Sequence, residues 1–134
     1  NLAGGELMGR GVFMTVNYER YFTNHFGLGV GLMGLPNPDG YGLISVMPLY
    51  LSVVPGDVRS LYLSVGTTWV GGNNTVNQYQ SRLLLSASVG YQFHSPGGFF
   101  WRPFLSYMVN TETDPGTTTY DFLILPGVTI GGSF

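Results

Sequence analysis

The residues best suited to chemistry in this 134-residue chain are two histidines, His25 and His94, and Ser95, which follows the second histidine. A histidine next to a serine can act as the base that activates a hydroxyl nucleophile. Both histidines fall in turn-rich segments, however, and no strand-borne carboxylate lies near either one in the sequence. We therefore interpret His94 and Ser95 as part of a solvated turn, and the sequence predicts no enzyme.

Two other patterns could hold a ligand. The chain has no Cys, and two isolated histidines do not supply the usual ligand set of a zinc site. Gly27, Gly29 and Gly31 have the spacing of a phosphate-binding loop, but no predicted helix follows to direct its N-terminus at a phosphate. We expect these glycines to lie in a strand where an aromatic ring packs over them. No metal and no cofactor is expected.

The charge content excludes nucleic-acid binding. Only 9% of the residues are charged, compared with about 25% in ordinary soluble domains. All five basic residues are Arg, and the net charge of −2 provides no basic field for phosphates. No apolar run reaches the roughly 18–20 residues of a membrane-spanning helix.

Clusters of turn-forming residues divide the chain into β-strands. The clusters are residues 23–25, 36–40, 55–60, 71–80, 94–98 and 111–118. Between them lie segments of roughly 10–16 residues rich in Val, Leu, Phe, Tyr and Thr, which predict strands joined by consecutive hairpins. The sequence thus predicts one all-β, antiparallel domain over residues 1–134, with seven long strands.

Apolar and polar residues alternate along these strands. In one strand, for example, Leu61, Leu63 and Val65 alternate with Tyr62 and Ser64. Charged residues within predicted strands lie mostly on the polar face: Glu19, Arg82, Arg102 and Asp121, with only Arg10 on the apolar face. A face made of Gly, Ser and Thr with four charges is too poor in charge to solvate a soluble domain. The pattern favours an up-and-down transmembrane β-barrel with an apolar outside and a polar interior.

The aromatic residues gather near the predicted strand ends. Transmembrane barrels carry girdles of aromatic residues at both membrane interfaces. We predict a girdle that includes Tyr18, Phe26, Trp69, Tyr91, Phe93, Trp101, Tyr107 and Tyr120.

Glu19 and Arg102 both face the predicted interior near the same rim. A buried charge without a partner is costly, so we predict that they form a structural ion pair. We expect Tyr50, Tyr62, Phe100 and Phe104 to fill the rest of the interior, because eight strands enclose a space that side chains just fill.

The chain resembles the small eight-stranded outer-membrane barrels of Gram-negative bacteria, the OmpA-like and OmpX-like superfamily. The resemblance rests on the alternation, on NYERYF at residues 17–22 before a short turn, and on a last strand ending in Phe134. It implies a bacterial outer-membrane location with a periplasmic C-terminus. It also implies that Phe134 belongs to the signal that the outer-membrane assembly machinery recognises.

Seven long strands leave such a barrel one strand short, because bacterial single-chain barrels have even strand numbers. We expect residues 1–5 to be the end of a missing first strand and its external hairpin turn, and residues 6–21 to form the next strand. An upstream segment, a partner chain, direct pairing of the two edge strands, or a turn at residues 125–127 that splits the tail would each restore closure. Pro48, Pro103 and Pro126 cannot donate to a ladder, so we expect bulges or broken pairing there.

Location constrains the function more than chemistry does. We expect a non-enzymatic integral outer-membrane protein, either a structural element or an accessory subunit of an envelope complex. Its partners would be the lipid bilayer, the assembly machinery and other envelope proteins. The alternative is an outer-membrane channel for small solutes or hydrophobic molecules.

Overall fold

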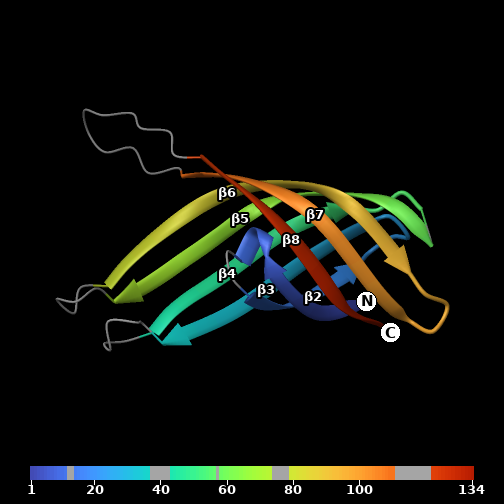
Figure 1. Cartoon of the computed structure of the whole chain (residues 1–134), viewed down its shortest axis with the longest axis horizontal. Helices are drawn as coiled ribbons and strands as arrows, with labels where there is room; N and C mark the ends of the chain where they lie inside the picture. The colour runs from blue at the N-terminus through green and yellow to red at the C-terminus, as the bar shows by residue number, and fades with distance from the viewer. Residues whose placement is uncertain (12–13, 37–42, 57, 74–78, 111–121) are drawn as a thin grey trace.

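Eight β-strands close into one antiparallel barrel in the computed structural model, which describes residues 1–11, 14–36, 43–56, 58–73, 79–110 and 122–134 (Figure 1). The strands are β1 (Leu2–Met8), β2 (Met14–Tyr21), β3 (Phe26–Pro36), β4 (Leu43–Val53), β5 (Arg59–Asn73), β6 (Tyr79–His94), β7 (Phe99–Asn110) and β8 (Phe122–Ser133). Each strand pairs with the next, and β1 pairs with β8. The predicted all-β, antiparallel barrel is confirmed.

Within the described residues, the one regular segment that is not a strand is a short 3-10 turn, η1 (Gly9–Gly11). No helix in the described part of the chain has the length and apolar character needed to cross a membrane.

The two ends of the barrel differ. The chain termini and the three turns β2–β3, β4–β5 and β6–β7 lie at one end, which we call the terminal mouth (Figure 1). Strands β3, β5 and β7 end, and strands β4, β6 and β8 begin, at the opposite end, which we call the loop end. The three predicted turns at residues 23–25, 55–60 and 94–98 all belong to the terminal mouth.

The expectation of a missing first strand is wrong for this barrel, because β1 takes that place. Residues 2–8 pair with β2 on one side and with β8 on the other, with Gly5 opposite both Val16 and Ile130. The predicted single strand over residues 6–21 is instead broken by η1 into β1 and β2. The tail is one continuous strand, so no turn divides it at residues 125–127. Closure pairs every edge, as a barrel in lipid requires.

Pro48 and Pro103 interrupt pairing without shifting the register, whereas the expected interruption at Pro126 is absent from the β7–β8 ladder. Between β3 and β4, pairing skips Gly31 and Leu32, which face Pro48 and Met47, and then resumes in the same register. The β6–β7 ladder skips the position of Pro103 in the same way. Pro126 pairs with Leu105 of β7 and lies just beyond the end of the β1–β8 ladder. The expected broken pairing is present at Pro48 and Pro103, and the constant register shows no bulge at either.

The barrel is apolar outside and polar inside. Val16, Val65 and Ile124 on the outer face are 72%, 60% and 58% exposed. By contrast, the interior carboxylates and guanidinium groups of Glu6, Arg10, Glu19 and Arg102 are at most 3% exposed. This inverts the usual arrangement of a water-soluble domain, in which charged residues are almost never fully buried.

Glycines on the inner wall make room for interior rings. A Cβ on Gly29 would overlap the ring of Tyr50, which lies opposite it on β4. Phe104 is placed similarly over Gly127 of β8. The expected packing of an aromatic ring over a glycine of residues 27–31 holds at Gly29, whereas Gly27 and Gly31 face polar side chains and Pro48.

Candidate functional site

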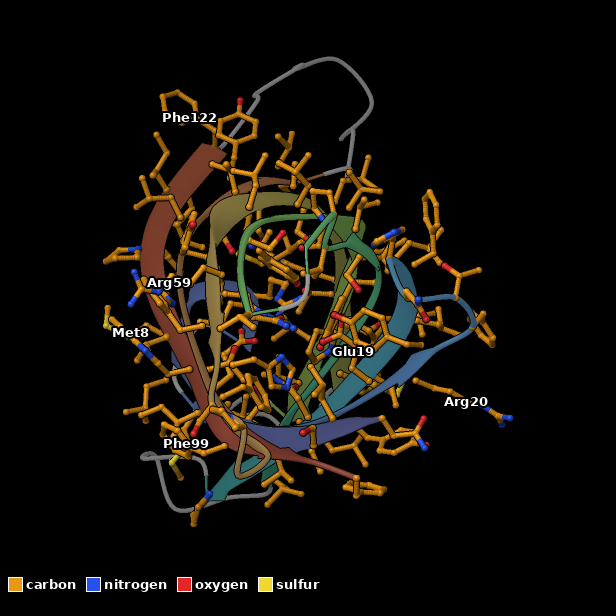
Figure 2. The ribbon with its side chains drawn as sticks, turned by 90° about the vertical axis from the view of Figure 1, so that its right-hand side faces the viewer. Met8, Glu19, Arg20, Arg59, Phe99 and Phe122 are labelled. Atoms are coloured by element: carbon orange, nitrogen blue, oxygen red, sulfur yellow. The ribbon has the colours of Figure 1, made fainter. Side chains whose placement is uncertain are left out.

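The polar interior is the candidate site, and its first half is built around Arg102 of β7. The structure brings Glu19 and Arg102 together across the barrel, with Nη1 of Arg102 2.8 Å from Oε2 of Glu19. In Figure 2 the Glu19 side chain lies within the barrel, whereas that of the next residue, Arg20, points outward. The alternation of a strand thus separates a buried carboxylate from an exposed guanidinium group one residue away.

Neutral side chains complete the hydrogen bonds of this pair. Arg102 donates from Nε to the side-chain oxygen of Gln92 at 2.9 Å, and from Nη2 to the same oxygen and to the Tyr21 hydroxyl. Ser52 donates to the second oxygen of Glu19. The guanidinium group also lies 3.9 Å from the centre of the Tyr62 ring. A buried ion pair with all these partners is tolerated, whereas an unpartnered charge would not be.

A second ion pair, between Glu6 and Arg10, lies deeper in the barrel, and sequence reasoning missed it. Nη2 of Arg10 is 2.6 Å from Oε2 of Glu6, and both side chains are fully buried. Asn17 donates to the same carboxylate oxygen at 2.8 Å. The placement of Arg10 on the apolar face was wrong: residues 9–11 turn into the interior, where the Arg10 guanidinium stacks 3.6 Å from the centre of the Tyr50 ring.

Backbone conformation explains why Arg10 leaves the strand pattern. Met8 and Gly9 have φ values of 58° and 70°, so the chain leaves the extended conformation at that point. The strand alternation that predicts an outward Arg10 holds only while the backbone stays extended. The missed signal was the pair Gly9 and Gly11 flanking Arg10, which breaks a strand pattern.

Tyr62 connects the two ion pairs. Its hydroxyl accepts a hydrogen bond from Nη1 of Arg10 at 2.7 Å, while its ring faces Arg102. The predicted interior aromatic residues Tyr50, Tyr62, Phe100 and Phe104 are all buried. A gap among Leu2, Asn17, Tyr50, Phe100 and Thr129 has no room for a water molecule. In the described residues, the interior is a filled, charge-balanced core.

The seven predicted girdle residues that the structure describes lie on the outer wall. Tyr91, Phe93 and Trp101 form a continuous group near the terminal mouth. The ring centre of Phe93 lies 4.9 Å from that of Tyr91 and 4.6 Å from that of Trp101. Tyr18 and Phe26 also lie near the terminal mouth. Toward the loop end, the ring centres of Tyr107 and Phe122 are 6.0 Å apart, and Trp69 lies at the same end of its strand. Tyr120 falls outside the described residues.

Phe134 is 74% exposed, and its ring centre lies 6.5 Å from that of Tyr18. Its backbone N–H donates to the carbonyl of Asn1 at 3.1 Å, so the last residue is held at the β1–β8 seam. Its side chain is therefore presented at the rim of the terminal mouth.

The histidines lie at the terminal mouth, as predicted turn residues would. Nδ1 of His25 is 3.1 Å from the carbonyl oxygen of Val54, and Nδ1 of His94 is 3.1 Å from the amide nitrogen of Gln92. No group of three or more His, Cys, Asp or Glu side chains suited to a metal ion occurs among the described residues. His94 also lines a cavity in this mouth.

Comparison of the chain with known proteins identifies no relative. No protein-family model, no curated protein and no solved structure matches the chain.

Proposed function

We propose that this protein is a non-enzymatic integral outer-membrane barrel that acts as a structural element or as an accessory subunit of an envelope complex. The observation that carries the proposal is the apolar outer wall: Val16, Leu32 and Val65 are at least 60% exposed, while four charged side chains are buried inside. In water that arrangement would expose a continuous apolar surface far beyond that of a soluble monomer. In a bilayer it is the expected arrangement.

The outer-membrane location is supported by the likeness to small bacterial outer-membrane barrels described from the sequence. In this proposal the terminal mouth faces the periplasm. Phe134, exposed at the end of the closing strand, serves as part of the signal for the assembly machinery.

The filled interior favours this role over the alternative of a channel. Two ion pairs and four aromatic side chains occupy the cross-section, and both guanidinium groups are fully buried. A conducting path would require breaking at least one ion pair and moving Tyr62, which bonds to one and stacks on the other.

The test compares two arginine substitutions on the outer face of β5. Val65→Arg lies near the middle of the strand, and Leu61→Arg lies four residues nearer the terminal mouth. In a bilayer Val65→Arg should cost roughly 2–4 kcal/mol and Leu61→Arg about 0–1 kcal/mol, because the penalty depends on depth. Urea unfolding from lipid vesicles measures both.

On a water-facing wall both substitutions would change stability by no more than about 0.5 kcal/mol, since both sites are already exposed. Equal, small effects of Val65→Arg and Leu61→Arg would therefore refute the membrane assignment.

A further inference from the structure

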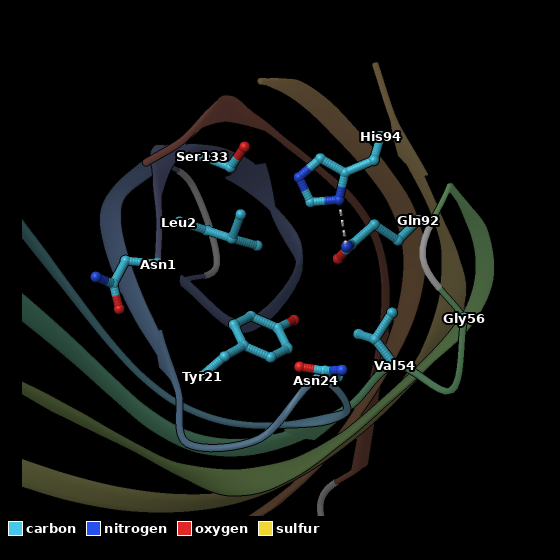
Figure 3. A pocket seen from close by; sticks show the side chains of 9 residues that line it. All are labelled: Asn1, Leu2, Tyr21, Asn24, Val54, Gly56, Gln92, His94 and Ser133. Carbon is cyan, nitrogen blue, oxygen red and sulfur yellow. Dashed lines mark hydrogen bonds between the residues drawn. The ribbon is translucent and has the colours of Figure 1, made fainter. Parts of the chain in front are cut away.

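The terminal mouth contains a cavity of about 290 Å³ that the proposed function does not use (Figure 3). Tyr21, Asn24, Gln92 and His94 contribute polar groups to its lining, and Leu2 and Val54 contribute apolar ones. The His94 ring and the Tyr21 ring point into the space from opposite walls (Figure 3). The buried Arg102 lies directly behind this lining, because it bonds to both Gln92 and Tyr21.

A chain of hydrogen bonds sets the orientation of His94. Arg102 can only donate, and it donates twice to Gln92, so the side-chain oxygen of Gln92 must face it. The amide nitrogen of Gln92 is then the atom 3.1 Å from Nδ1 of His94, and it must donate to that nitrogen. A neutral imidazole that accepts at Nδ1 carries its hydrogen at Nε2. The hydrogen bonds from Arg102 through Gln92 therefore orient the neutral His94 ring so that Nε2 carries the hydrogen and can donate it.

The electrostatics of the cavity select a neutral ligand. Arg102, which bonds to Gln92 and Tyr21 of the lining, is already paired with Glu19 at 2.8 Å. The side chains that line the space are three carboxamides, two hydroxyls and an imidazole, next to two aliphatic side chains. Carboxamide and hydroxyl groups can each donate and accept hydrogen bonds. They therefore suit a ligand with hydroxyl groups, which also donate and accept.

We propose that the terminal mouth is a binding site for a small neutral polyhydroxylated molecule of the size of one sugar ring. The hydroxyl groups of the ligand bond to His94 Nε2, the Asn24 amide and the Tyr21 hydroxyl. Its C–H face packs on Leu2 and Val54. Sites of this kind combine apolar walls with a few polar groups that fix orientation, and the cavity lies near the lower end of their usual size range.

The experiment titrates the full-length, isotopically labelled protein with glucose in amine-oxide micelles, whose headgroups carry no sugar. Saturable shifts of the backbone amide NMR signals of Asn24, Gln92 and His94 are expected. His94→Phe should weaken binding roughly fivefold to tenfold, because one donor is lost. His94→Gln, which retains an N–H donor, should recover most of that loss.

Tyr91→Phe is the matched control, because it removes an aromatic hydroxyl from the outward face of the same strand and should leave glucose binding unchanged. Succinate, a dianion, should not produce saturable shifts. The proposal is overturned if glucose produces only linear, non-saturating shifts, if succinate binds more tightly than glucose, or if His94→Phe binds glucose as well as the native protein does. Thermal unfolding of each variant shows that the barrel is intact during the titration.

Discussion

At the scale of single residues, the interior depends on a balance of two carboxylates and two guanidinium groups. Each charged group is buried, and each contacts an opposite charge within 2.8 Å. Tyr62 contacts both guanidinium groups, so the two pairs are not independent. Replacing one charged residue should therefore affect the stability of both ion pairs.

Glu19→Gln should destabilise the folded barrel by about 3–5 kcal/mol, because it leaves the Arg102 guanidinium buried without a counter-charge. Urea unfolding of the barrel in micelles or vesicles measures this loss. Arg20→Gln is the control: its side chain is exposed on the next residue and should change stability by less than about 0.5 kcal/mol.

The double variant Glu19→Gln, Arg102→Met removes both charges and should regain much of the stability lost in Glu19→Gln. If Glu19→Gln costs no more than Arg20→Gln, the ion pair is not a stabilising feature of the interior.

At the scale of elements, the segment that joins β1 to η1 has the most demanding geometry. Gly9 has a φ of 70°, and a Cβ placed on it would lie 2.5 Å from the Phe104 ring. Only glycine adopts this conformation without cost while admitting the ring so closely. The segment carries Arg10 into the interior, so its geometry determines where the second ion pair forms.

Gly9→Ala should therefore destabilise the protein by at least about 1–2 kcal/mol, from the backbone term alone. Gly97→Ala is the matched substitution in open space, because its nearest atom would be 4.0 Å away, and it should be close to neutral. Thermal unfolding of both variants distinguishes them. Equal stabilities would show that residues 9–11 do not occupy the interior.

The seam between β1 and β8 can be tested by cross-linking, because the chain has no native Cys. Gly5 and Ile130 are direct partners in the ladder, so Gly5→Cys with Ile130→Cys should form a disulfide on mild oxidation. Non-reducing gel mobility and mass spectrometry detect the bond.

The control pair is Gly5→Cys with Val128→Cys. Val128 is two residues out of register with Gly5, and its partner is Leu7. Its diagonal separation is about 7–8 Å, which exceeds disulfide reach. Cross-linking of the control pair but not of Gly5 with Ile130 would mean that another strand or register closes the barrel.

At the scale of the whole molecule, eight strands set the size of the interior, and its side chains fill it. The rings of Tyr50 and Phe104 lie over Gly29 and Gly127 of neighbouring strands, so these two side chains extend across the interior without widening the wall. The outer wall therefore presents apolar side chains to the surroundings, and the interior side chains stabilise the barrel through contacts between strands.

The protein should produce no steady single-channel current in planar lipid bilayers, because two ion pairs and four buried aromatic side chains occupy the described interior. The same current measurement on Glu19→Gln shows whether loss of one interior ion pair is enough to open a conducting path. Steady currents from the native protein would replace the structural role with the channel alternative.

The sequence by itself determined the class of fold, the three turns of the terminal mouth and the polarity of the two faces. These features follow from a local property, the alternation of residues with period two, which LYLSV at residues 61–65 shows as clearly as any other strand. The pairing of Glu19 with Arg102 also followed, because strand parity and the distance of each residue from its turn place both at one height inside the barrel.

Only the tertiary structure decided how the barrel closes and where Arg10 lies. β1 is short, and Ala3, Gly4 and Gly5 give it almost no alternating side-chain pattern, so its pairing depends on the edges offered by β2 and β8. Arg10 lies in the interior because Glu6, Tyr50 and Tyr62, from three different strands, meet there to receive its charge. The contacts of Arg10 with Tyr50 and Tyr62, which are distant in the chain, leave no periodic trace in the sequence.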